Sequence, residues 1–502
     1  MLKFTVKEGH VLRERVDAIL VGIYEDAGEK GPLAAEVNRL LGGAIDKVLS
    51  RKSFTGKVEQ TDVLEARETL PASYFILCGL GKADKAGLEQ IRQAMGRAVL
   101  RAREMGLKRI GVSTNSFVCG TENIVAGDAS TAMTEGANLA LYRFTKYKVK
   151  ENDNSKNIEE IRFVEDEKKT VTVVKKGVEK GRIISDSVNL ARDLINHPAN
   201  DMTPTILAES AKKTAKAAGV KCTVLSRPQI EKLGMGAYLG VSQGSEEPPR
   251  FIILEYNGGK RGEKPVVVVG KSITFDSGGI SIKPSEGMGK MKYDMSGGAA
   301  TIGVLRAASM LRLPLNIVGL LPATENMPSG SAIRPGDVLR SMSGRTIEII
   351  STDAEGRLAL SDALFYATRY KPRWIIDIAT LTGACAVALG SHAIGMLGNN
   401  KDLKDRMAAA GEKVWERVWE MPLWDEYAEQ IKSPVADMKN SGGREGGVIT
   451  AAIFLSKFVE DCPWVHLDIA STEWIDKDRA YMPAGPTAIG TRLILQLLMD
   501  AC

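Results

Sequence analysis

Charged residues gather in one stretch of the sequence, residues 266–358, at positions where short buried elements are predicted to begin or end. They are four acids, two lysines and one arginine: Asp276, Asp294, Asp353, Glu355, Lys271, Lys283 and Arg357. A globular core normally excludes such charge, and carboxylates crowded together at pH 7 repel one another unless cations neutralise them. Two divalent metal ions would remove this repulsion, activate a shared water molecule and polarise a substrate carbonyl. We therefore interpret the stretch as a two-metal hydrolytic site.

Simpler roles exist for each acid taken singly. Asp276 could cap a turn, Asp294 could cap a helix, and Asp353 with Glu355 could cap the helix that follows. The last two lie two residues apart after a predicted strand, and in an extended chain this spacing places both carboxylates on the same side. We favour metal binding because all four acids occur together among lysines and an arginine. A two-metal phosphoesterase is an alternative, although such sites usually recruit histidine. The four histidines all lie outside the stretch: His10, His197, His392 and His466.

The elements that must position these residues alternate between strand and helix patterns. Strands are predicted at 251–256, 265–270, 315–321, 346–351, 374–380 and 465–470. Helices are predicted at 204–219, 299–313, 358–370, 403–418, 448–458 and 487–499. This alternation predicts an open α/β/α domain with a mixed, mainly parallel sheet, and ligands bind such sheets at the carboxyl ends of the strands. Asp276 is expected in the loop after the strand at 265–270.

The first part of the chain repeats the α/β pattern but shows no cluster of convergent polar groups. Strands are predicted at 18–24, 73–80, 109–114 and 161–164, and a helix is predicted at 88–105. The composition turns polar between residues 148 and 169, and a helix predicted at 178–195 follows. We therefore predict a smaller N-terminal α/β domain, residues 1–166, without an active site. This linker helix joins it to a larger catalytic domain, residues 167–502, as expected for a chain too long for one core.

Two short motifs imitate known sites, and we reject both. Gly270-Lys271-Ser272 resembles the end of a phosphate-binding loop, but Pro265 stands where that loop requires glycine, and no helix start follows. Residues 240–244 match the nucleophile elbow of hydrolases, but the sequence after Ser242 indicates a glycine-rich loop and not the required helix.

The composition excludes several classes of protein. The chain is 44% hydrophobic and 26% charged, and it contains neither a signal peptide pattern nor an apolar segment long enough to span a membrane. Its six scattered cysteines form no CxxC pair, so we expect buried thiols in a reducing, cytoplasmic compartment. The net charge of +5 is slight and neither demands nor forbids a nucleic-acid partner.

Three segments of the charged stretch resemble the leucyl, or cytosol, aminopeptidases. They read G-K-S-I-T-F-D-S-G-G-I-S-I-K (270–283), Y-D-M-S-G-G-A-A (293–300) and S-T-D-A-E-G-R-L (351–358), and T-D-A-E-G-R-L is highly specific for the family. The resemblance covers the whole second domain, whereas the N-terminal domain fits only loosely. It implies a metal-dependent peptidase in which a two-metal-activated water removes N-terminal residues, leucine and other mostly apolar amino acids, from peptides.

The resemblance also implies a role for each charged residue. Five match the ligands of two divalent ions per subunit: Lys271, Asp276, Asp294, Asp353 and Glu355. Asp276 and Glu355 would bridge both ions, and the lysine ligand must be neutral, so its pKa would be lowered by burial and the adjacent ions. Lys283 matches the residue that polarises the scissile carbonyl, and Arg357 matches the residue that holds a bicarbonate ion as general base. Four residues match positions that line the pocket for the first side chain: Met291, Thr380, Leu381 and Gly383.

Cofactors and partners follow from the same resemblance. The ions are expected to be Mn²⁺ or Zn²⁺, with Mg²⁺ and Co²⁺ as further options, because carboxylate-rich sites accept several metals. The resemblance implies a peptide substrate with a free N-terminus. It also implies a homohexamer of two stacked trimers, in which the N-terminal domain serves oligomer assembly. Some bacterial members of the family also bind DNA, so a bifunctional aminopeptidase with a DNA-binding or architectural role is the alternative. Two departures from the family pattern, Ser272 and Ser351, fall on no ligand position.

Overall fold

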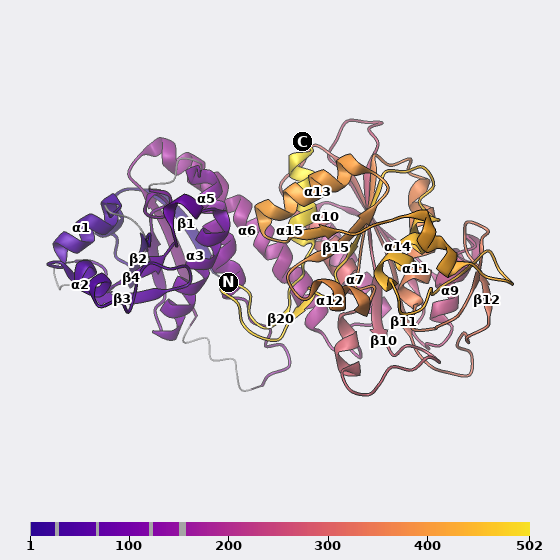
Figure 1. Ribbon diagram of the computed structural model, residues 1–502. Coiled ribbons are helices and arrows are strands. Elements are labelled where there is room, and N and C mark those ends of the chain that lie inside the picture. The colour runs from indigo at the N-terminus through magenta and orange to yellow at the C-terminus, as the bar shows by residue number, and fades with distance from the viewer. Residues whose placement is uncertain (1, 26–29, 67–69, 120–123, 150–156) are drawn as a thin grey trace. The chain divides into compact units, whose positions relative to one another are not determined.

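The computed structural model describes residues 2–25, 30–66, 70–119, 124–149 and 157–502, and the chain forms two compact units (Figure 1). The first unit contains the chain up to Asp186 together with the segment Asp476–Ala484, and the second contains the remainder. Helix α6 (Lys168–Asn196) runs from the first unit into the second and contains the helix predicted at 178–195. The units divide inside α6 and not at its start, where the sequence had suggested residue 166.

A six-stranded sheet forms the first unit, in the order β1-β6-β5-β2-β4-β3. Its strands are β1 (Lys3–Glu8), β2 (Ala18–Ile23), β3 (Thr61–Glu65), β4 (Tyr74–Gly79), β5 (Arg109–Val112) and β6 (Glu160–Glu165). Its helices are α1 (Pro32–Leu40), α2 (Ala44–Ser50), α3 (Leu88–Glu104), α4 (Asn115–Val118) and α5 (Ala126–Ala140). Only β3 pairs antiparallel with its neighbour, so this unit is the α/β domain that the sequence predicts.

The second unit is built on a nine-stranded sheet in the order β16-β15-β18-β14-β9-β11-β8-β7, with β10 paired to β11 beside this path. Its strands are β7 (Lys221–Leu225), β8 (Arg250–Asn257), β9 (Val266–Gly270), β10 (Ser272–Asp276), β11 (Asn316–Asn326), β14 (Trp374–Ala379), β15 (Ile394–Gly398), β16 (Val418–Glu420) and β18 (Trp464–Asp468). The central strands β11, β9, β14 and β18 are parallel, whereas β8 and β15 join the sheet antiparallel. The predicted mixed, mainly parallel sheet is confirmed.

Helices cover both faces of this sheet (Figure 1). They are α7 (Pro204–Ala218), α9 (Gly236–Ser242), α10 (Ser296–Met310), α11 (Glu355–Thr368), α13 (Lys401–Val414), α14 (Gly447–Ser456) and α15 (Thr491–Asp500). Val267 and Val269 of β9 share a hydrophobic core with side chains of α9, α11 and α14. Alternate residues of a strand point to opposite faces, so Val266 and Val268 face the layer in which α10 packs on β9. The arrangement is the predicted α/β/α sandwich.

Two local predictions differ from the structure. The strand expected at 346–351 is shorter, β13 (Thr346–Glu348), and it belongs to a separate small sheet with β12 (Val338–Arg340) and β17 (Met438–Lys439). It ends early because Oδ1 of Asn440 accepts the N–H groups of Ile350 and Ser351 at 2.8 and 3.3 Å, in place of a neighbouring strand. Ser242 ends helix α9 instead of lying in a loop, and its hydroxyl donates to the carbonyl of Leu239 at 2.7 Å. No helix within the described ranges combines the length and the hydropathy of a membrane span.

Candidate metal centre

Two of the predicted ligands lie where the central strands end. β9 and β10 pair with successive parts of β11, so together they form an almost continuous line along it. Lys271 stands at the break between them, where its N–H donates to the carbonyl of Ile378 on β14 at 3.0 Å. Asp276 is the last residue of β10, so the prediction that it lies in a loop is wrong. The reason is that the chain after Lys271 pairs with the end of β11. The segment is too short for its sequence to predict this pairing.

The other three carboxylates come from helix boundaries. Asp294 lies between the 3-10 helix η4 (Met288–Tyr293) and α10, and Glu355 is the first residue of α11. Asp353 stands in the turn before α11, so it does not share an extended segment with Glu355, contrary to the prediction. The turn still brings the two together. One oxygen from each of them and one from Asp276 all lie within 4.8 Å of one another.

Lys271 is buried among these acids. Its Nζ donates to Oδ1 of Asp294 at 2.7 Å and to the carbonyl of Thr380 at 2.8 Å, and it lies 2.9 Å from Oε1 of Glu355. Burial lowers the pKa of this amine, but the carboxylates of Asp294, Glu355 and Asp276 raise it by more, so the pKa lies above its ordinary value. The neutral form expected of a lysine ligand therefore requires cations that neutralise these carboxylates.

The close packing around Lys271 and Asp353 depends on glycine at two positions. A Cβ at Gly356 would lie 2.4 Å from Cε of Lys271, so only glycine lets the first turn of α11 approach the lysine. Gly278 adopts a φ of 87°, and a Cβ there would lie 2.4 Å from the carbonyl oxygen of Ser281 and 2.9 Å from Oδ1 of Asp353. The glycines after Asp276 and Glu355 in the sequence motifs are thus explained by steric contact.

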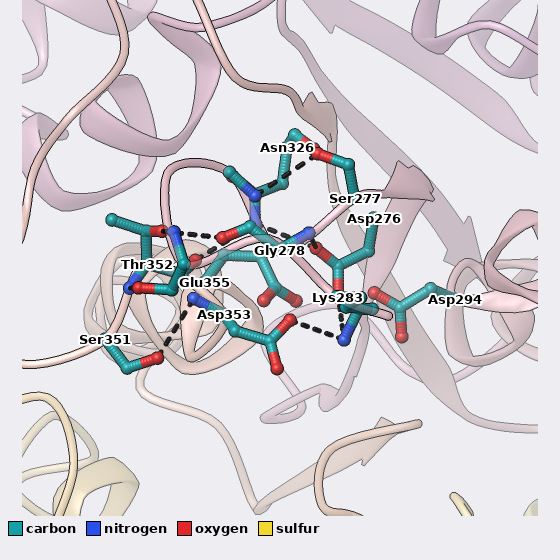
Figure 2. A network of polar contacts seen from close by, with 12 residues as sticks. Asp276, Ser277, Gly278, Lys283, Asp294, Asn326, Ser351, Thr352, Asp353 and Glu355 are labelled. Carbon is teal, nitrogen blue, oxygen red and sulfur yellow. Dashed lines mark hydrogen bonds and ion pairs between the residues drawn. The ribbon is translucent and has the colours of Figure 1, made fainter. Parts of the chain in front are cut away.

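Lys283 lies between two further carboxylates, as Figure 2 shows. Its Nζ is 2.9 Å from Oδ2 of Asp276 and 2.5 Å from Oδ1 of Asp353. Burial lowers the pKa of Lys283, but the carboxylates of Asp276 and Glu355 raise it by more, so the side chain is an ammonium. Its side chain is 21% exposed, compared with 4% for Lys271, and so it is the lysine accessible to a bound molecule.

Buried carboxylate oxygens without partners show that these residues fit divalent cations. Oδ2 of Asp294 and Oε2 of Glu355 accept no hydrogen bond from the described residues. Burial raises the pKa of Asp294 well above its ordinary value, and the charges of Glu355 and Asp276 add to this effect while Lys271 opposes it. Carboxylate oxygens are the ligands that Mg²⁺ and Mn²⁺ prefer, and Zn²⁺ also accepts them. Cations would satisfy the unpaired oxygens and relieve the repulsion between them.

Two polar residues that the sequence did not single out hold the ligands in place (Figure 2). Nδ2 of Asn326 donates to Oδ1 of Asp276 at 2.8 Å and to the carbonyl of Thr352 at 3.0 Å. Oγ1 of Thr352 donates in turn to the carbonyl of Gly278 at 2.6 Å. Asn326 was missed because the strand at 315–321 continues to residue 326 as β11. The signal that would have found Asn326 is its position at the end of β11, on the same edge of the sheet as Asp276.

Arg357 is suited to hold an anion. It is 8% exposed, its Nη1 donates to the carbonyl of Asn440 at 2.9 Å, and its buried Nε has no hydrogen-bond partner among the described residues. Burial lowers the pKa of Arg357 to about 10, although Glu355 and Asp468 raise it in part, so the guanidinium stays charged at neutral pH. A buried cation with an unused donor fits a small planar anion such as bicarbonate.

A cavity of about 1060 Å³ opens onto this cluster. Its lining includes every residue that the sequence assigned to the site: Lys271, Asp276, Lys283, Met291, Asp294, Asp353, Glu355, Arg357, Thr380, Leu381 and Gly383. Apolar residues from helix α12 (Gly383–Leu389), from just after β16 and from the start of α14 form another part of the wall: Ala384, Val387, Ala388, Met421, Val448 and Ile449. The cavity combines a charged floor with apolar walls, as binding sites for small ligands commonly do.

The end of β18 and the segment after it contribute two residues that the sequence analysis did not identify. Asp468, the last residue of β18, accepts the N–H of Leu381 at 3.2 Å and the hydroxyl of Thr382 at 2.7 Å, and so it fixes the loop after β14. Glu473 lines the cavity from the same segment. The strand predicted at 465–470 ends beside Asp468, so the rule that ligands gather at strand ends was the available signal for it.

Comparisons with known proteins match both parts of the chain. The model of the cytosol aminopeptidase family, catalytic domain, matches residues 189–495, and the model of its N-terminal domain matches residues 20–151. The chain belongs to the cytosol aminopeptidase family. As a member of this family it is a metal-dependent aminopeptidase, and the resemblance inferred from its motifs is confirmed.

Proteins similar to this chain match it over nearly its whole length. The probable cytosol aminopeptidase of Syntrophotalea carbinolica is 45% identical over 485 residues, which cover 96% of this chain and 97% of the relative. That of Geobacter sulfurreducens is 45% identical over 481 residues, with 96% of each covered. The solved structure of the bottromycin maturation enzyme BotP in complex with Mn has a TM-score of 0.85 and 32% identity, covering 97% of this chain and 99% of that one. A tomato leucine aminopeptidase mutant has a TM-score of 0.88 and 31% identity, covering 100% and 97%.

Proposed function

We propose that the chain is a dinuclear metallo-exopeptidase that removes N-terminal residues from peptides. The observation that carries this proposal is the set of oxygens from Asp276, Asp353 and Glu355 within 4.8 Å of one another, at the floor of a cavity that admits a peptide end. Two divalent ions bound there, Mn²⁺ or Zn²⁺ with Mg²⁺ and Co²⁺ as options, would take the free amine of the substrate, activate a water and polarise the first carbonyl. The apolar wall supports acceptance of leucine and other mostly apolar residues.

Five residues would hold the two ions: Lys271, Asp276, Asp294, Asp353 and Glu355. Asp276 and Glu355 are the buried members of the three-carboxylate group, so their charges are the ones that would most need bound cations to neutralise them. Once cations neutralise the carboxylates, the charges that raise the pKa of Lys271 are offset and its burial favours the neutral amine. The same lysine is positioned by the carbonyl of Thr380, so its Nζ keeps its place in either form.

Lys283 would stabilise the negative charge that develops on the carbonyl oxygen. Its ammonium is already charged, fixed between Asp276 and Asp353, and open to the cavity, so little rearrangement is needed for it to donate to an oxyanion. Arg357 would hold bicarbonate through its unpaired Nε while its Nη1 stays on the carbonyl of Asn440. Bicarbonate, when bound, supplies a general base for proton transfer to the leaving amine.

The first side chain of the substrate would lie against four lining residues: Met291, Thr380, Leu381 and Gly383. Oγ1 of Thr380 donates to Oδ1 of Asp294 at 2.7 Å, so this wall is tied directly to a proposed ligand. This link supports a side-chain pocket beside the position of the free amine, an arrangement that the removal of a single N-terminal residue requires. We further propose that the chain assembles as a homohexamer of two stacked trimers and works in the cytoplasm. Light scattering that gave a mass other than six chains would overturn the assembly.

Hydrolysis of leucyl-p-nitroanilide tests the proposal. The purified chain should hydrolyse it, lose activity after dialysis against a chelator, and regain activity when Mn²⁺ or Zn²⁺ is restored. Metal analysis of the restored enzyme should give two ions per chain. Activity that the chelator leaves unchanged, or no activity with any of the four metals, would overturn the proposed function. We do not propose DNA binding as a second function, because the slight net charge of +5 is the single property of this chain that favours it.

A further inference from the structure

One buried acid of the cavity wall has no part in the proposed mechanism. Glu473 lines the cavity and is 7% exposed. Burial raises the pKa of Glu473 to about 8, and Asp468 adds to this rise, while the backbone N–H groups of Glu473 and Thr472 and the charge of Lys271 lower it. Buried acids are rare in proteins unless a cation or hydrogen bonds compensate for the loss of water. The backbone N–H groups of Glu473 and Thr472 stabilise the ionised carboxylate only in part, because its pKa is still raised, so a neighbouring cation would stabilise it further.

Glu473 lies in the chain between Asp468 and Trp474, each of which contacts an element that carries the proposed side-chain pocket. β14 and β18 pair in parallel along their lengths, so the segments that follow them leave the sheet side by side. Backbone N–H groups of the loop after β14 donate to Asp468, which joins the two segments. On the other side of Glu473, the ring of Trp474 lies 5.3 Å from the ring of Tyr293, which ends the 3-10 helix that contains Met291. Glu473 is thus beside the pocket for the first side chain.

The cavity wall does not supply a cation for Glu473. Beyond the five proposed metal ligands, the charged lining residues in the described part of the chain are Lys283, Arg357, Arg444 and Glu473. Lys283 lies between Asp276 and Asp353, and Arg357 is the residue proposed to hold an anion. Arg444 is exposed to solvent, whereas Glu473 is buried. Lys271 is the cation whose charge reaches Glu473, but its Nζ is already 2.7 Å from Asp294 and 2.9 Å from Glu355. A cationic group of the bound substrate would be a suitable counter-ion.

We infer that Glu473 makes the pocket prefer peptides whose first residue is lysine or arginine, an inference that rests on the proposed aminopeptidase function. Both side chains have a long aliphatic stem, which can pack on Met291 and Leu381, and a cationic tip that can pair with the carboxylate. A cation beside Glu473 favours its ionised form and so strengthens the pair. Leucine can use the apolar surface but brings no cation to the carboxyl group, so it is accepted and is turned over less efficiently.

Arginine and citrulline test this inference because citrulline has nearly the shape of arginine and no charge. We compare arginyl, citrullinyl and leucyl coumarinamide substrates with the Mn²⁺-loaded, full-length enzyme. The wild type should have a kcat/KM for arginyl about 10- to 100-fold above that for citrullinyl, the range expected for one charge-assisted hydrogen bond. Glu473→Gln, which keeps the shape of the side chain, should bring this ratio close to one. Glu445→Gln removes the same charge from an exposed residue outside the lining and should keep the wild-type ratio.

A second readout is independent of turnover. Free L-arginine should raise the melting temperature of the Mn²⁺-loaded wild type more than L-citrulline does, and this difference should disappear in Glu473→Gln. Equal arginyl and citrullinyl rates in the wild type would overturn the inference and leave the aminopeptidase function standing, and so would an unchanged ratio in Glu473→Gln. Failure to hydrolyse any of the three substrates would overturn both. If Glu473→Gln does not fold, the wild-type ratio decides, and Glu473→Asp provides the second variant.

Discussion

Replacing Lys283 by methionine tests whether its ammonium acts on the reacting carbonyl. Methionine keeps an unbranched side chain but removes the charge that lies 2.9 Å from Asp276 and 2.5 Å from Asp353. Loss of one preorganised oxyanion donor lowers kcat by about 10²–10³-fold, which corresponds to roughly 2.7–4 kcal/mol. The side chain is 21% exposed, so solvent screens its charge in part and the lower end of this range is expected. KM should change little, because the donor acts in the transition state and not on the bound substrate.

The assay for Lys283→Met is steady-state hydrolysis of leucyl-p-nitroanilide, with the metal content of each sample measured alongside. Equal metal content in wild type and variant assigns the loss to catalysis and not to a damaged metal centre. Lys260→Met makes the same substitution at an exposed lysine outside the cavity and should leave kcat unchanged. A Lys283→Met enzyme with two ions per chain and wild-type kcat would refute the reasoning and remove Lys283 from the mechanism.

Three further substitutions test the site and its support. Asp294→Ala should abolish hydrolysis and lower the metal content measured by elemental analysis; full activity would exclude Asp294 as a ligand. Gly356→Ala should cut activity at least about tenfold and destabilise the fold by about 1–3 kcal/mol in urea denaturation, because its Cβ would lie 2.4 Å from Cε of Lys271. Burial raises the pKa of Asp362 to about 7 from 3.8, so its contribution to stability is fullest below about pH 4 and is lost as the pH rises through 7. Asp362→Asn should therefore flatten the fall in unfolding free energy between about pH 4 and 7 in metal-free protein, and an unchanged slope over that range would contradict the raised pKa of Asp362.

The fold was largely predictable because its central strands are buried on both faces. Such strands read as continuous apolar runs, and β9, β14 and β18 were found from them with their ends within a residue or two. Strands with partly exposed residues were missed, because β1 and β7 carry mixed side chains. β10 was missed although it is mostly buried, because it is short and follows β9 after a single residue. Their place is decided by pairing with distant strands, and that information lies outside any local window.

The charged side of the site was predictable for a different reason. Acids and lysines at element boundaries are conspicuous against an apolar background, and all the assigned residues line one cavity. Asn326, Asp468 and Glu473 were not found, because their importance comes from which strands are neighbours. Asp468 matters only because β18 lies beside β14, and this adjacency joins positions almost 90 residues apart in the chain. The spacing of residues within a motif does not predict which strands are neighbours in the sheet.

The proposed ligands are far apart in the chain and meet only after β9, β10, β11 and α11 have assembled. An unfolded chain offers no comparable set of oxygens, so ions that bind the native arrangement shift the folding equilibrium towards it. At a free metal concentration about 100 times Kd, this shift amounts to about 2.7 kcal/mol for each site. Metal supply would then govern how long the protein survives as well as how fast it works. Molecules deprived of their ions would open more often and be degraded first, so the surviving population would be enriched in active enzyme.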